Sequence, residues 1–271
     1  MTYSQQRQDF LPPLMTSLLV SAGTTSIRLT SDVRNFGRLS ELPKLERLWC
    51  FDVDEKRMET ISRCQSLQRL YIDGGRIANI DALLGLGELR FLSLDSMRMF
   101  TSLDKLARFV GLSGLSIENA AKVKSLEPLQ SLTKLGALSL SGGMYSTMKV
   151  ESLGPLQSLK SLHFLSLLNV KARDASLSPL RGLDQLRILE LPNFYPVKEF
   201  ARLAACLKNT SCQWFSPWID CSGSVFRCAK CGGNSGNVML TGGGARILCR
   251  DCDAERVKKH EACFHHNATA A

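Results

Sequence analysis

Four cysteines near the C-terminal end have the residue type and spacing of a metal-ligand set. They form the pairs Cys228-Ala-Lys-Cys231 and Cys249-Arg-Asp-Cys252, which are separated by seventeen residues. Two such pairs about 15 to 20 residues apart are typical of a tetrahedral zinc site. Because all four ligands are sulfur and none is left for water, we expect one structural Zn²⁺ rather than a catalytic one. An iron site of the same geometry, or two disulfides in an exported protein, are the alternatives.

The residues around these pairs predict the hairpin that must bring them together. Gly232 and Gly233 permit the positive φ angles of a tight knuckle, and residues 238–240 and 246–248 have strand character on either side of a Thr-Gly-Gly-Gly tip. Asp253 is placed to cap a closing helix. The segment resembles a zinc ribbon, whose core is too small to fold alone. The metal would then supply folding free energy on the order of 10 kcal/mol.

The other potential ligands and nucleophiles form no comparable pattern. Near the ribbon lie Cys221, His260, Cys263, His265 and His266, whose spacing matches no second paired set. We expect Cys263 and Phe264 on the buried side of the last helix. Four further cysteines, Cys50, Cys64, Cys206 and Cys212, are expected to be core thiols. The chain has no phosphate-binding loop, no His-Glu-x-x-His and no Gly-x-Ser-x-Gly motif, so we expect no enzymatic activity.

Most of the chain is an internal repeat of Leu-x-x-Leu-x-Leu. The seven instances are Leu45–Leu48–Cys50, Leu67–Leu70–Ile72, Leu89–Leu92–Leu94, Leu112–Leu115–Ile117, Leu135–Leu138–Leu140, Leu162–Leu165–Leu167 and Leu186–Leu189–Leu191. Their first members are 22, 22, 23, 23, 27 and 24 residues apart, and Ile27 and Leu29 fit one period earlier. Alternation within Leu-x-Leu predicts a short strand, and leucines every three residues between strands predict short helical or 3₁₀ turns. Stacked repeats then make an α/β solenoid with a curved parallel sheet.

The units Ser125 to Leu140 and Glu151 to Leu167 resemble the short leucine-rich repeats of protein phosphatase regulatory subunits and many bacterial repeat proteins. The resemblance covers roughly residues 24–195. The family's asparagine three residues after the last strand leucine is replaced here by Val53, Gly75, Met97, Ala120, Gly143, Val170 and Phe194. Asn119, Asn169 and Asn193 lie one place earlier and are candidates to substitute. We therefore expect less regular turns than in the family.

Both ends of the solenoid need a cover, because an open end would expose its core. We assign residues 1–23 to an N-terminal cap, 24–195 to the repeats, 196–220 to a C-terminal cap and 221–271 to the zinc ribbon and closing helix. An export signal over residues 10–23 is the alternative for the first segment. In the C-terminal cap we expect a helix after Pro196 and a ninth strand through Cys212 and Trp214. Trp214, Phe215 and Trp218 should cover the end of the core.

Side chains that flank the buried strand leucines should point to the concave face. In the N-terminal half these are Arg28, Arg47, Trp49, Phe51, Arg69, Tyr71, Asp73, Phe91 and Asp95. Exposed aromatics between arginines are typical of protein interfaces, so this set is the predicted partner-binding surface. The alternative is that some of the aromatics pack on each other across neighbouring strands.

The formal net charge of +9 favours acidic partners. No stretch approaches the ~20 apolar residues of a membrane-spanning helix. Cysteines with metal spacing and others in apolar segments indicate a reducing, cytoplasmic compartment. We therefore predict a monomeric protein-interaction module that binds a partner protein on its concave face. The alternative is a nucleic-acid-associated protein that uses the basic zinc ribbon, whose net charge from Ser222 onward is +3, seven Lys and Arg against four acids.

Overall fold

The computed structural model describes residues 14–18, 21–75, 77, 80–96, 99–143, 145–244 and 246–270. Residues 1–13 of the predicted N-terminal cap, part of the candidate export segment, and Met97 in one repeat turn lie outside the described residues.

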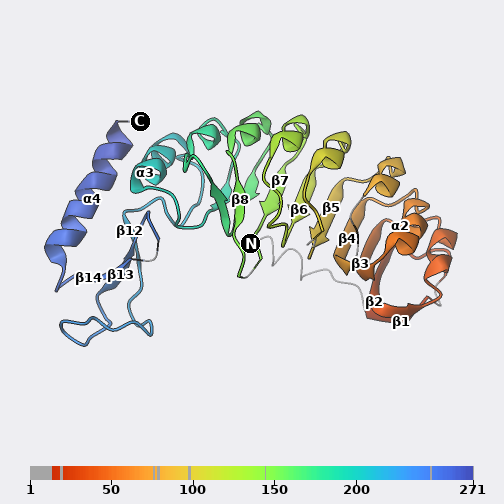
Figure 1. Ribbon diagram of the computed structural model, residues 1–271, viewed down its shortest axis with the longest axis horizontal. Helices are drawn as coiled ribbons and strands as arrows, with labels where there is room; N and C mark the ends of the chain where they lie inside the picture. The colour runs from red at the N-terminus through yellow and green to blue at the C-terminus, as the bar shows by residue number, and fades with distance from the viewer. Residues whose placement is uncertain are drawn as a thin grey trace.

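The principal sheet is parallel throughout and has nine strands within the described residues. In spatial order they are β1 (Leu14–Ser17), β2 (Ser26–Arg34), β3 (Arg47–Val53), β4 (Arg69–Gly75), β5 (Phe91–Asp95), β6 (Gly114–Ile117), β7 (Ala137–Leu140), β9 (Phe164–Ser166) and β11 (Ile188–Glu190). Figure 1 shows them along the inner side of a curved solenoid. The predicted fold class is confirmed. Strand β1 was not predicted, because Leu14–Ser17 carries no repeat motif.

Short helical segments form the outer side of the arc (Figure 1). They are the 3₁₀ segments η1 (Phe36–Glu41), η2 (Asp81–Gly85), η3 (Asp104–Arg108), η4 (Glu127–Ser131), η5 (Gly154–Ser158) and η6 (Ser178–Leu180), together with α2 (Glu55–Ser62). A 3₁₀ helix has three residues per turn, so leucines three apart all face the core. Two short parallel strands, β8 (Met148–Val150) and β10 (Val170–Ala172), pair beside the main sheet.

The leucine register is continuous from strand to strand. Leu48 pairs with Leu70, Leu70 with Leu92 and Leu92 with Leu115, and the series continues through Leu138, Leu165 and Leu189. These side chains are buried in one extended core. A slip by one residue would turn every leucine to the other face, so burial fixes the register.

Most turns that follow the strands contain a residue in the left-handed conformation, two places after the last apolar residue of the repeat motif. That position has positive φ in five of the seven repeats, at Asp52 (48°), Gly74 (76°), Ser96 (59°), Asn119 (60°) and Asn169 (56°). Asn, Asp and Gly tolerate this conformation best, which explains why Asn119 and Asn169 lie one place earlier than in the family pattern, whereas Asn193 does not have a positive φ. The Asn119 amide also donates to Asp95 Oδ1 of the preceding repeat at 2.8 Å. Asn119 and Asn169 thus help to build the turns, as predicted for substitutes.

The C-terminal end of the repeats is closed by a helix and a tryptophan. Helix α3 (Val197–Cys206) begins after Pro196, as predicted. The predicted ninth strand is wrong, because only Ser211 pairs with the sheet, in a single bridge to Ile188. Trp214 is buried there, as expected, and its Nε1 donates to Leu191 O at 2.8 Å.

A small antiparallel sheet and a helix follow. They are β12 (Trp218–Asp220), β13 (Asn237–Leu240), β14 (Ile247–Cys249) and α4 (Ala254–Thr269). Trp218 was expected in the cap but starts the first strand of this sheet and packs on its own core of Val238, Leu240, Leu248 and Val257. Pairing of β12 with β13 over 16 intervening residues could not be read from local pattern, because Trp218–Asp220 is only three residues long.

This small module is docked on the solenoid. The Asn193 amide donates to Leu240 O at 2.9 Å and to Gly244 O at 3.1 Å, and its oxygen accepts from Gly242 N. Gly242 has φ +89°, and a Cβ there would lie 2.5 Å from Val197 N. The glycine tip is therefore a docking element as well as a hairpin turn. Helix α4 lies beside α3 (Figure 1), where Phe264 joins the main core.

None of the helices in the described ranges is both long and apolar enough to cross a membrane.

Candidate metal centre and concave face

The four predicted ligands converge at the end of the small module. The Sγ atoms of Cys228, Cys231, Cys249 and Cys252 all lie within 4.8 Å of one another. Zn–S bonds of about 2.3 Å in a tetrahedron place sulfurs about 3.8 Å apart, so small adjustments would bring all four onto one ion. Cys249 is buried, while Cys231 is exposed. Among the described residues no other group of His, Cys, Asp or Glu has ligand geometry, so the nearby Cys221, Cys263 and histidines form no second site.

The backbone of the first knuckle is shaped by Gly232 and Gly233. The N–H of Gly232 donates to Cys228 O, and the N–H of Cys228 donates to Gly233 O, both at 2.8 Å. Gly232 has φ +71°, as predicted, whereas Gly233 is not in the left-handed region. The second knuckle is closed by Asp253 N, which donates to Cys249 O at 2.9 Å. Local hydrogen bonds thus hold each cysteine pair in shape.

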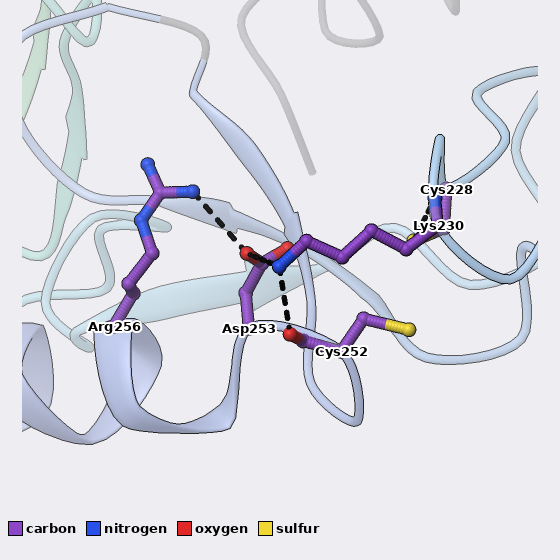
Figure 2. A network of polar contacts seen from close by, with 5 residues as sticks. All are labelled: Cys228, Lys230, Cys252, Asp253 and Arg256. Carbon is purple, nitrogen blue, oxygen red and sulfur yellow. Dashed lines mark hydrogen bonds and ion pairs between the residues drawn. The ribbon is translucent and has the colours of Figure 1, made fainter.

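A lysine of the first knuckle ties it to the second (Figure 2). Lys230 Nζ donates to Cys252 O at 3.0 Å and pairs with Asp253 Oδ1 at 2.8 Å, and Arg256 binds the same oxygen at 3.2 Å. Helix α4 begins directly after Asp253, but its side chain makes no capping hydrogen bond. Asp253 is thus the N-cap residue, as predicted, but its Oδ1 binds Lys230 and Arg256 in place of a backbone N–H of the helix. Asp253 instead links the helix to the cysteine site.

The four thiols of the cluster affect one another's ionisation. Hydrogen bonds from the backbone N–H groups of Cys231 and Lys230 lower the pKa of the Cys228 thiol to about 7. The neighbouring sulfurs, that of Cys231 first, raise the pKa of Cys252 to about 12. Four thiols so close cannot all ionise without a compensating positive charge, which a bound divalent ion supplies. The donor set fits zinc, with all four coordination positions filled by protein.

The remaining cysteines divide between core and surface. Cys50 and Cys64 are buried, and burial raises the pKa of Cys64 to about 11, so they are core thiols as predicted. Cys212 is half-buried. Cys206 and Cys263 are exposed, so the prediction of burial is wrong for both. Cys263 precedes Phe264 on α4, and only Phe264 faces the solenoid.

The nine predicted concave-face residues form three columns across β2 to β5. Strand register places Arg47 beside Arg69 and Phe91 in the first column, and Arg28 beside Trp49 and Tyr71 in the second. The third column has Phe51 beside Asp73 and Asp95. The surface is thus basic along one margin, aromatic in the middle and acidic along the other margin.

The aromatic side chains in these columns pack on each other, which was the alternative prediction. Trp49 and Tyr71 are stacked with ring centroids 4.5 Å apart, and Tyr71 lies 5.1 Å from Phe91. Trp49 and Tyr71 are each only 8% exposed, so they were wrongly expected to be exposed. Phe51 and Phe91 are half-buried, and Arg47 and Arg69 are exposed.

Contacts that were not predicted also shape this face. A Cβ on Gly114 would lie 2.4 Å from Phe91 Cδ2, so the ring of Phe91 fills the space beside the glycine. The Arg28 guanidinium lies 5.7 Å from the centroid of the Phe51 ring, a cation–π contact. Asp95 Oδ1 accepts hydrogen bonds from Ser96 N and from the Asn119 amide, so this oxygen takes part in the turn that follows the strand. A glycine within a strand often marks close approach of a neighbouring group, so Gly114 was the sequence signal for its contact with Phe91.

Comparison with solved structures found the following similarities, of which the first agrees with this architecture. An internalin (InlF) from Listeria monocytogenes superposes with a TM-score of 0.57 at 19% identity, covering 70% of this chain and 54% of that protein. Internalin C2 of the same organism gives a TM-score of 0.45 at 24% identity, over 56% of this chain and 64% of that one. The plant peptide hormone receptor RGFR1 in complex with RGF2 gives 0.45 at 14% identity, over 80% and 38%.

The chain is therefore a leucine-rich-repeat solenoid that carries a four-cysteine module at its C-terminal end. It spans about half the length of the first internalin, and that similarity establishes the fold alone. No protein-family model matches the sequence. No curated protein matches it either.

Proposed function

We propose that this protein binds a partner protein through the N-terminal half of its concave face. The observation that carries the proposal is the arrangement of the three columns. Exposed Arg47 and Arg69 flank a rigid aromatic stack, with Asp73 on the far margin. Interfaces are enriched in aromatics and arginine, and a stack that is already packed loses little conformational entropy when a partner covers it.

The best test changes the exposed arginines and leaves the buried stack intact. In an affinity pull-down with mass spectrometry, Arg47→Glu/Arg69→Glu should lose the proteins that the unmodified chain retains. A matched control is Lys56→Glu/Arg108→Glu, which reverses two exposed cations on α2 and η3 at the outer side. It should retain the same proteins. If the two variants retain the same set, the concave-face proposal is wrong.

The four-cysteine site is proposed to hold one structural Zn²⁺ in a reducing compartment, where thiols bind metal instead of pairing as disulfides. The module, from β12 onward, would then act as a zinc-stabilised C-terminal cap. Its basic side chains are largely engaged within it: Lys230 and Arg256 with Asp253, and Arg250 at 5.0 Å over the Trp218 ring. This disfavours the nucleic-acid alternative, in which these cations would need to reach phosphates.

A further inference from the structure

A second exposed surface, remote in sequence from the concave-face columns, carries a row of basic side chains. β8 and β10 pair with Lys149 opposite Lys171. The segment 122–124 lies beside β8, since Glu151 N donates to Lys124 O at 2.9 Å. The β8–β10 pairing makes two columns, Lys149 beside Lys171 and Glu151 beside Arg173, and Lys122 and Lys124 occupy the equivalent sequence positions of the preceding repeat. We call these six side chains the basic strip.

The charge of the basic strip is not compensated. All five cations are exposed, and within the described ranges none of them has an ion pair within 4.0 Å. Glu151 is the single acid among the six residues. Adjacent strands lie about 4.8 Å apart, so the lysines of one column repel each other. Such a row does not stabilise the solenoid, which points to a role in binding.

The basic strip is also hollowed. Lys124, Lys149, Glu151, Lys171 and Arg173 surround a depression of about 360 Å³ whose lining includes the buried Val150 and Ala172. An adjoining depression of about 480 Å³ is lined by Lys122, Lys124, Ser125 and Pro128 and by Thr101, Ser102 and Asp104 of the preceding repeat. Lys124 belongs to both, so the strip is continuous across the repeats.

We infer that the basic strip binds an extended acidic segment of a partner polypeptide. Within one strand the two columns are two residues apart, or about 6.7 Å, which is also the spacing of alternate side chains in an extended peptide. Alternate carboxylates can therefore meet Lys171 and Arg173, or Lys122 and Lys124, while along β8 only Lys149 offers a cation. The apolar lining of the hollow accommodates the methylene groups of glutamate side chains. No aromatic side chain lines either depression, so nucleic-acid bases have no stacking platform there.

The test is fluorescence anisotropy with a labelled peptide of about twelve residues that alternates Glu and Thr, a length that spans the strip. The variant Lys149→Glu/Lys171→Glu should bind it about tenfold more weakly or worse at ~0.1 M salt, because two attractive charges become repulsive. The control Lys44→Glu/Lys56→Glu makes the same change of net charge at exposed sites elsewhere, and screening should limit its effect to about twofold. Lys149→Arg/Lys171→Arg should retain binding.

Three results would overturn the inference. The first is an equal loss of peptide affinity in both Glu variants. The second is equal affinity for a peptide with Gln in place of Glu. The third is tighter binding of a single-stranded oligothymidylate, with that binding lost in Lys149→Glu/Lys171→Glu. The last result would identify a nucleic acid as the occupant. The concave-face variant Arg47→Glu/Arg69→Glu should change peptide affinity by no more than about twofold, because salt screens the interaction between charges on different surfaces.

Discussion

Replacement of Asn193 by alanine should undock the C-terminal module from the solenoid. The Asn193 side chain makes three hydrogen bonds to the glycine hairpin: two from its amide to Leu240 O and Gly244 O, and one to its oxygen from Gly242 N. It is buried, and the hairpin groups that it binds face the end of the repeats. Alanine would remove all three bonds, although Gly244 O also accepts from Arg246 N at 2.9 Å and would keep that partner.

The expected cost follows from these contacts. At about 1 kcal/mol for each buried hydrogen bond, the loss in free energy of unfolding is about 3 kcal/mol. For a protein of this size that corresponds to a fall in Tm of about 6 to 10 °C. The exposed Asn209, which follows α3, provides the matched control, and Asn209→Ala should change the free energy of unfolding by less than about 0.5 kcal/mol.

Hydrogen exchange measures the undocking directly. The N–H groups of Gly243 and Gly244 donate to Tyr195 O at 3.0 Å and to Asn193 O at 2.7 Å. Their protection should fall in Asn193→Ala, while the amides of β5 stay protected. A decrease in Tm below about 2 °C, together with unchanged protection of the glycine hairpin, would refute the proposed docking role.

Further predictions concern the metal and the concave face. Metal analysis should return about one zinc equivalent for each chain. The variant Cys228→Ser/Cys249→Ser should lose this zinc and the near-ultraviolet circular dichroism of the module. A metal-free wild type with unchanged structure would contradict the prediction. Acidification should release the metal, because protons compete for thiolates and affinity falls with pH, as a zinc-indicator titration would show; release on raising the pH would contradict this. Gly114→Ala should destabilise by about 1 kcal/mol in urea unfolding because its methyl meets the Phe91 ring, whereas Gly87→Ala, with no atom within 4 Å of its added Cβ, should stay within about 0.5 kcal/mol. If both glycine variants changed the free energy of unfolding equally, the contact between Gly114 and the Phe91 ring would not explain the effect.

The sequence determined the features that repeat at short range. Leucines three apart in the turns and two apart in the strands fix the solenoid, because each repeat presents the same apolar pattern to its neighbour and the register follows from burial. The convergence of the four cysteines was equally readable from the sequence. Each cysteine pair forms a local knuckle, and a hairpin is the short connection that brings both knuckles together.

The tertiary structure decided where single side chains end up. The sequence placed Trp49 and Tyr71 on the concave side, but only neighbouring strands show that they stack and lose exposure. Asn193 and Gly242 are 49 residues apart, and no local pattern announces their contact. The physical reason is that periodicity reports which face of an element is buried. Contacts between elements also depend on the shapes of the packed side chains and on residues distant in sequence. They depend as well on which of several polar groups hydrogen-bonds to a given atom.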